Sequence, residues 1–205
     1  MASWDEAMES PSSPPLRSAL LTFLVADFRG YTSYTAERGD EAAALLTSRC
    51  ADLIEEVAPA HHGEVLELRG DEVLAVFSSA RQALHAAVEI RRRFPVEIGQ
   101  GTGVEVGIGV DAGDAVPVKG GYRTGALNLA ARLQSLARGE VFASETVIAL
   151  AGTTEGLAFV DRGEVRVKGR AAPVRVFEVG PDGELPSELP PLQPVVTAPP
   201  NQPPR

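Results

Sequence analysis

Cysteine, aromatic residues and positive charge are all scarce in this chain, and the scarcities of cysteine and of positive charge each argue against a class of protein. Among its 205 residues there is one cysteine, and aromatic residues make up 5%. A single cysteine cannot form an internal disulfide, so the chain is not a disulfide-bonded secreted scaffold. Cys50 falls on an apolar helical stripe with Leu46, Leu53 and Val57, which predicts a packed position in the core.

Negative charge outweighs positive charge, with 28 Asp and Glu against 19 Lys and Arg and a formal net charge of -9. An acidic surface of this kind argues against nucleic acid or an anionic membrane as a partner. Nucleotides are still possible ligands, because a few local cations and bound metals can outweigh the average negative potential of the surface. No apolar run approaches the roughly 18 residues of a membrane-spanning helix, and nothing resembles a signal peptide, so we expect a cytoplasmic protein.

Proline is concentrated at the ends of the chain. Residues 1–17 carry Ser, Pro and Glu without periodicity, and residues 181–205 are crowded with prolines. Such segments cannot bury enough surface to order themselves. We therefore expect a disordered tail over 1–17, one domain over 18–180, and a disordered tail or linker over 181–205, beyond which further domains of a longer protein could follow.

The middle of the chain alternates between strand-like and helix-like patterns. Strands are predicted over 20–27, 65–77 (a hairpin), 104–110, 115–118, 141–143, 164–168 and 174–179. Helices are predicted over 31–38, 40–60, 79–94, 127–137 and 144–151. The order is β-α-β-β-α-β with extra C-terminal strands, which predicts an α+β fold. Its ferredoxin-like core would have a largely antiparallel sheet with helices on one face.

Two aspartates stand at the ends of apolar strands. Asp27 ends the first strand, and Asp71 lies in the turn of the hairpin. A carboxylate at a strand end and another at a hairpin tip can hold two divalent cations between them, and such metal pairs typically act on triphosphates. Gly-Asp turns are common, so Asp71 taken alone is equally well explained as a turn former.

A later helix and a later turn carry polar and cationic residues. Asn128 and Arg132 lie one helical turn apart and project from one face. Arg132 could stabilise negative charge on a phosphoryl group while Asn128 orients a ribose; the alternative is a solvated helix face. Lys168, in the turn 167–170 (VKGR), suits a terminal phosphate, although a turn of this composition taken alone is an ordinary surface loop.

Together these motifs resemble the catalytic domain of class III adenylate/guanylate cyclases, over about residues 19–180. The matching segments follow the family's order: 23–32 (FLVADFRGYT), 68–77 (LRGDEVLAVF), 126–133 (ALNLAARL) and 167–169 (VKG). Each segment alone is a weak signal. Four of them in one order indicate the fold and, with it, nucleotidyl cyclase activity.

The resemblance implies a two-metal reaction on ATP or GTP. Two Mg²⁺ or Mn²⁺ ions on Asp27 and Asp71 would activate the ribose 3′-hydroxyl, which attacks the α-phosphorus to give a 3′,5′-cyclic nucleotide and pyrophosphate. Arg132 would meet the charge on the α-phosphate, and Lys168 the leaving pyrophosphate. The first metal motif adds three expected substrate-binding residues, Phe28, Gly30 and Thr32.

The resemblance also implies a homodimer, because in this family one subunit gives the aspartates and the other gives the Asn and Arg. A monomer should therefore be inactive. The expected base-reading positions depart from the family. Glu67 stands where adenylate cyclases have Lys and guanylate cyclases Glu, and Gly121 stands where they have Asp or Cys. Gly121 has no side chain to read a base, so ATP and GTP both stay open; the segment 113–128 is also shorter than the family's usual dimerisation hairpin.

Two alternatives stand beside an active cyclase in cyclic-nucleotide signalling. The first is a catalytically weak or inactive cyclase-homology domain that serves as a nucleotide-binding or dimerising regulatory module. Gly121 and the short 113–128 segment favour this alternative. The second is a diguanylate cyclase, because 69–73 (RGDEV) resembles that family's Gly-Gly-Asp-Glu-Phe hairpin. That family lacks the helix of Asn128 and Arg132 and the late Val-Lys-Gly turn.

Overall fold

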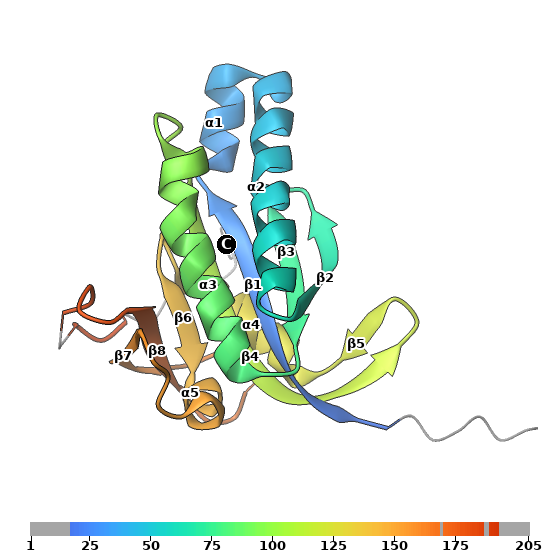
Figure 1. Ribbon diagram of the computed structural model, residues 1–205, viewed down its shortest axis with the longest axis vertical. Coiled ribbons are helices and arrows are strands. Elements are labelled where there is room, and N and C mark those ends of the chain that lie inside the picture. Colours follow the sequence, from blue (N-terminus) through green and yellow to red (C-terminus); the bar gives the residue numbers. More distant parts are fainter. Residues whose placement is uncertain (1–16, 169, 187–188, 193–205) are drawn as a thin grey trace, which may run out of the picture.

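The computed structural model describes residues 17–168, 170–186 and 189–192, and Figure 1 shows its elements. The first half of the chain forms β1 (Ala19–Arg29), α1 (Tyr31–Arg38), α2 (Asp40–Ala60), β2 (Gly63–Arg69), β3 (Glu72–Phe77), α3 (Ala80–Phe94) and a short π-helix, η1 (Pro95–Gly99). The second half forms β4 (Glu105–Val118), β5 (Gly121–Arg123), α4 (Gly125–Leu136), β6 (Val141–Ser144), α5 (Glu145–Ala151), β7 (Leu157–Val165) and β8 (Val174–Pro181).

The strands form one sheet in the order β2-β3-β1-β4-β6-β8-β7, and β5 pairs with β4 beside this path. β1 lies between β3 and β4 and is antiparallel to both. β4 pairs with β6 in parallel, and the other pairs are antiparallel. The first four strands with α2 and α3 make the predicted ferredoxin-like core, so the predicted fold class is confirmed.

Both faces of β1 are buried. Leu24, Ala26 and Phe28 pack into the core beneath α2 and α3, whereas Phe23 and Val25 pack on the other face together with residues of α4. Figure 1 shows α2 and α3 in front of the sheet and α4 behind it. The prediction that helices cover one face is therefore wrong for α4. The continuous apolar run of β1 is typical of a strand that is covered on both sides.

The predicted core stripe of α2 is confirmed. Leu46, Cys50, Leu53 and Val57 are all buried in the cluster between α2 and the sheet. Burial raises the pKa of the Cys50 thiol to about 12. The thiol is therefore uncharged at neutral pH and is a packing residue rather than a nucleophile.

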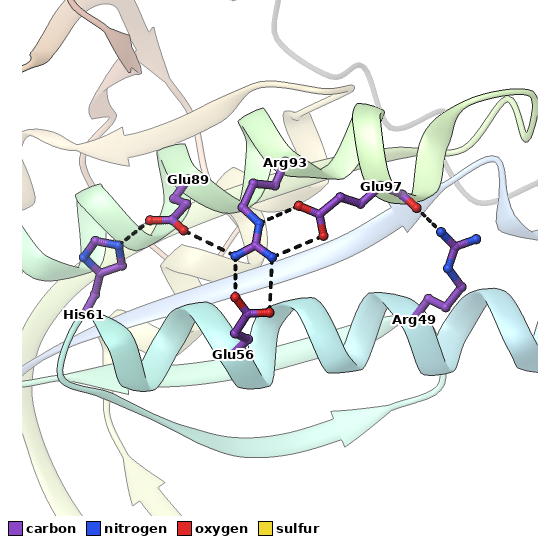
Figure 2. A network of polar contacts seen from close by, with 6 residues as sticks. All are labelled: Arg49, Glu56, His61, Glu89, Arg93 and Glu97. Atoms are coloured by element: carbon purple, nitrogen blue, oxygen red, sulfur yellow. Dashed lines mark hydrogen bonds and ion pairs between the residues drawn. The ribbon is translucent and has the colours of Figure 1, made fainter.

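Arg93 joins α2 to α3 through a set of ion pairs (Figure 2). Its Nη1 lies 2.8 Å from Oε1 of Glu56 on α2, and its Nε lies 2.6 Å from Oε1 of Glu97. Glu89, one turn earlier on α3, contacts Arg93 and also lies 2.8 Å from Nε2 of His61 at the end of α2. The network holds the two helices side by side along their length.

Three strands differ from their predictions. β4 is continuous through Asp111 and Gly113, where two shorter strands were predicted, because Asp111 is buried within the sheet and does not end it. β5 was not predicted, since three residues carry too little pattern. β7 runs from Leu157 to Val165, whereas a strand was predicted only over 164–168; a register shift between Asp161 and Glu164 breaks its alternation.

Described residues beyond residue 180 lie against the last two strands. The backbone nitrogen of Leu192 donates to the carbonyl of Arg162 over 2.8 Å, and a Cβ on Gly180 would lie 2.9 Å from Cγ of Leu185. Residues 1–16 and 193–205 lie outside the described residues, so the predicted tails and the boundary at 180 stay predictions. No helix in the described ranges is long and apolar enough to cross a membrane.

Candidate functional site

The helix α4 approaches the sheet unusually closely, at two glycines of β4. A Cβ on Gly109 would lie 2.1 Å from the carbonyl oxygen of Ala130 and 2.3 Å from the backbone nitrogen of Gln134, so only glycine allows this packing. Gly107 on the same face is also crowded by backbone at the end of α4. Because Gly107 pairs with Asp27 across β1 and β4, the C-terminal half of α4 lies over Asp27.

Asp27 is held by two side chains that the sequence analysis missed. Gln134 donates from Nε2 to Oδ2 of Asp27 over 2.9 Å, and Nη1 of Arg29 lies 3.0 Å from the same oxygen. Arg29 also donates to the carbonyls of Gln134 (2.9 Å) and Ala137 (3.1 Å), which caps the C-terminus of α4 with a cation. The available signal for Gln134 was a polar residue one turn after Ala130, on the buried face of α4.

The hairpin tip brings Asp71 next to Asp27. The backbone nitrogen of Phe28 donates to the carbonyl of Asp71 over 3.2 Å, and Asp27 pairs directly with Glu72. Burial raises the pKa of Asp27, Arg29 opposes the rise, and the charge of Asp71 adds to it. Burial and then the charge of Asp27 also raise the pKa of Glu72. The structure therefore gathers the two predicted metal residues in one acidic region.

The donor set at Asp27 and Asp71 suits a hard divalent cation. Within the described ranges no group of three or more His, Cys, Asp or Glu side chains is arranged to hold a metal by itself. Mg²⁺ is commonly bound by only one or two carboxylates, with water and substrate phosphates as its other ligands. Two carboxylates that repel one another, as Asp27 and Asp71 do, fit that pattern.

The predicted cationic residues converge on a second place. Asn128 and Arg132, both exposed on α4, line a cavity of about 490 Å³ together with Lys168 and Arg170. The cavity lies between α4 and the turn after β7, and Val167, which also lines it, packs against the cluster that contains Leu129. Among the described residues, neither Asp27 nor Asp71 lines it. One chain thus carries the carboxylates and the cations in separate places.

A smaller cavity of about 190 Å³ joins the β2–β3 hairpin to α4 and is lined by Glu67, Glu72 and Asn128, among others. Oε1 of Glu67 lies 2.5 Å from Nε of Arg69, so its carboxylate is paired within the hairpin. Gly121 lies in β5, opposite Val118 near the turn of the β4–β5 hairpin, with φ at +148°. Over the part of the chain that the structure describes, it lines neither this cavity nor that of Arg132.

The three residues of the first metal motif differ in what they can offer a ligand. The Phe28 ring is buried and stacks on Phe94 with centroids 5.7 Å apart, so only its backbone can face a substrate. Gly30 has φ +85°, and a Cβ there would lie 2.8 Å from the carbonyl oxygen of Gly103. Thr32 is exposed in the first turn of α1, so its hydroxyl can face a ligand.

Another cavity, of about 840 Å³, lies elsewhere, between the end of α3, the start of β4 and β8. Its lining mixes both signs of charge, with Arg91, Arg92 and Arg138 beside Glu105 and Glu178. It contains none of the residues predicted for the site, and its mixed charge indicates no particular ligand.

Comparisons with known proteins relate most of the chain to proteins named as adenylate or guanylate cyclases. No family model matches the chain. It is 26% identical over 170 residues to a protein of Rhizobium meliloti (strain 1021) named "Putative adenylate cyclase 3", covering 81% of this chain and 29% of that protein. The adenylyl cyclase CyaB of P. aeruginosa superposes with a TM-score of 0.69 at 24% identity, over 80% of this chain and 94% of that one. The adenylate/guanylate cyclase/hydrolase of Silicibacter pomeroyi gives 0.69 at 26%, over 81% and 99%.

Proposed function

Because the chain resembles class III adenylate/guanylate cyclase catalytic domains in sequence and fold, we propose that it cyclises a nucleoside triphosphate, ATP or GTP, in cytoplasmic cyclic-nucleotide signalling. The products are a 3′,5′-cyclic nucleotide and pyrophosphate. The observation that carries the proposal is the pair of complementary places: Asp27 with Asp71 at one, and Asn128 with Arg132 and Lys168 at the other.

In this proposal the ribose 3′-oxygen attacks the α-phosphorus. The bond between the α-phosphorus and the oxygen that joins it to the β-phosphorus breaks, and the hydroxyl proton leaves to solvent. Two Mg²⁺ or Mn²⁺ ions, held by Asp27 and Asp71, would lower the pKa of the 3′-hydroxyl and neutralise phosphate charge. Arg132 stabilises the charge that develops on the α-phosphoryl group, and its planar fork suits two phosphate oxygens. Asn128 orients the ribose, and Lys168 binds the pyrophosphate end.

The proposal places each site between two copies of the chain. Within one chain the cationic cavity lacks the aspartates among its described lining residues, so neither set can complete the reaction alone. In a two-fold dimer, Asp27 and Asp71 of one subunit would face Asn128 and Arg132 of the other, and both sites would form at once.

A weak or inactive regulatory module is the second candidate function. Gly121 offers no side chain, and the Glu67 carboxylate is already paired with Arg69, so neither expected position has an unpaired group with which to bind the base. A site that makes few hydrogen bonds to the base discriminates weakly between purines. A diguanylate cyclase finds less support, because that reaction has no use for the cavity of Asn128 and Arg132.

The test is incubation of the purified protein with Mn²⁺ and each of the four ribonucleoside triphosphates, with products separated by chromatography. We expect a cyclic mononucleotide and pyrophosphate in equal amounts from ATP, GTP or both, and none from the Asp71→Asn variant. Nucleotide binding without any product would favour the regulatory module. A cyclic dinucleotide from GTP would favour the diguanylate cyclase.

A further inference from the structure

A buried carboxylate lies beneath the cationic cavity, on the face of the sheet that carries α4. Asp111 belongs to β4, between Gly109 and Gly113, and is 1% exposed. The Ser144 hydroxyl, which also accepts from the backbone nitrogen of Val147 at the start of α5, donates to Oδ1 of Asp111. Burying a carboxylate is costly unless it is paired, so this residue needs a partner for its second oxygen.

Arg170 is that partner. Its Nη2 lies 3.7 Å from Oδ2 of Asp111, and its side chain is 44% exposed. Arg170 also lines the cavity of about 490 Å³, together with Arg132 and Lys168. One end of the guanidinium therefore faces the buried Asp111 carboxyl group, while donors remain for a ligand in the cavity. The carboxylate is nearly inaccessible and the arginine is half-exposed, so Asp111 orients Arg170 rather than binding anything itself.

We propose that Arg170 is a third cationic ligand for the polyphosphate group of the substrate and that Asp111 is the positioning residue that aims it. The inference rests on the proposed function, since it adds a residue to the same phosphate site. A di- or triphosphate carries several negative charges, and Arg132, Lys168 and Arg170 bring three positive charges to one cavity. Arginine suits the role because its fork can bind two phosphate oxygens at once.

The test is isothermal titration with pyrophosphate, which needs no turnover. We expect Arg170→Gln to weaken pyrophosphate binding about tenfold, or about 1.4 kcal/mol, and Arg170→Lys to restore part of the loss. Arg175→Gln is the matched control, because Arg175 is also half-exposed and paired with a carboxylate, that of Asp161, away from the cavity. The control should stay within about twofold of the wild type. Equal weakening by both Gln variants would overturn the inference, since it would show only a loss of net positive charge.

The positioning role is tested by a double-mutant cycle. Asp111→Asn should weaken pyrophosphate binding about threefold in the wild type and have no further effect in Arg170→Gln, because Asp111 acts through Arg170. Additive losses would overturn the positioning role. If Asp111→Asn fails to fold, Ser144→Ala, which frees the Asp111 carboxylate, takes its place in the cycle with the same expectation.

The outcomes separate this inference from the proposed function. Pyrophosphate binding that depends on Arg170, in a wild type that makes no cyclic nucleotide, keeps the inference and removes the cyclase. Turnover by the wild type with pyrophosphate binding that is indifferent to Arg170 keeps the cyclase and removes the inference. Titration with inorganic phosphate distinguishes the ligand classes: affinity equal to that for pyrophosphate would contradict a polyphosphate site.

Discussion

Gln134 donates its side-chain amide to Oδ2 of Asp27 over 2.9 Å, from the C-terminal half of α4 to the end of β1. The bond is shielded, since Gln134 is 4% exposed. The same helix presents Asn128 and Arg132 on its outer face. In the proposed dimer, the buried side of α4 would therefore contact Asp27 in one site. The exposed side of the same helix would supply Asn128 and Arg132 to the other site. In such a dimer this contact would physically link the two sites.

The first prediction tests what Gln134 does for Asp27. Gln134→Met keeps the length of the side chain and removes the amide, so the Asp27 carboxylate loses one of the two groups that hold it and keeps Arg29. Because partners of a ligating carboxylate commonly contribute 10–100-fold to metal affinity, we expect Mn²⁺ to bind about tenfold more weakly. Titration calorimetry measures this without turnover. Gln82→Met on α3 is the control, and unchanged Mn²⁺ affinity in a folded Gln134→Met would contradict the role.

The second prediction concerns the close packing of α4 on β4. A Cβ at Gly109 would lie 2.1 Å from a backbone oxygen of α4, which cannot move without shifting the helix. We expect Gly109→Ala to lower the free energy of unfolding by about 3 kcal/mol. Gly113→Ala is a matched control on the same strand, because its Cβ would meet the Cβ of Ala126 at an ordinary 3.4 Å. Urea denaturation should show a loss of under about 1 kcal/mol for the control; equal losses would refute the argument.

The sequence predicts those parts of the site that lie on regular elements with a visible period. Asn128 and Arg132 share a helix face by spacing alone, and the Asp71 turn is marked by its glycine, so the structure places all three where the pattern requires. Gln134 and Asp111 could not be assigned this way. Each is a polar residue in an apolar stretch, and its partner is set by the register of β1 with β4 and by the depth of α4, which depend on contacts far apart in the chain.

The third prediction concerns the network of Arg93 (Figure 2) and its dependence on pH. The hydrogen bond from His61 lowers the pKa of Glu89 below its ordinary 4.5, with Arg93 adding to the effect. A lowered carboxyl pKa contributes stability that is present above pH 4.5 and is lost as the pH falls through the folded-state pKa. We expect Glu89→Gln to melt about 2 °C below the wild type at pH 7, and the difference to be smaller at pH 3.5, below the ordinary pKa of 4.5.

Glu55→Gln, an exposed change on α2, is the control for this experiment and should track the wild type at both pH values. The difference between wild type and Glu89→Gln should also shrink in 1 M NaCl, because salt screens exposed ion pairs. A difference that is independent of pH would assign the effect to packing rather than to charge.

The fourth prediction concerns the choice of base. Glu67 lines the cavity beside Asn128 and pairs with Arg69 at 2.5 Å, so Glu67→Lys replaces an acceptor by a donor and frees Arg69. An ammonium can donate to N1 of adenine, whereas a carboxylate cannot. We expect the ratio of kcat/KM for ATP over GTP to rise about tenfold, or about 1.4 kcal/mol. Glu64→Lys on the same strand is the control. An unchanged ratio would place Glu67 outside the base pocket and favour the regulatory module.

The fifth prediction tests the shared site by mixing two inactive variants. Asp71→Asn removes one proposed metal residue, and Arg132→Ala removes the proposed transition-state cation, so each homodimer should have no complete site. Random exchange gives roughly half heterodimers, each with one intact site, so up to about a quarter of the wild-type activity should return on mixing. Activity should also rise with protein concentration if the dimer is weak.

The same experiment contains its own control. Mixing Asp71→Asn with Asp27→Asn should restore nothing, because both changes fall on the same side of the site and every dimer then lacks a metal residue in each site. Activity in a strictly monomeric fraction of the wild type would contradict the shared site. It would require the carboxylates and the cationic cavity of one chain to close on a single nucleotide. The packing of α4 against Gly109 and Asp27 opposes such a closure, because the helix that carries Arg132 is fixed to the strand that carries Asp27.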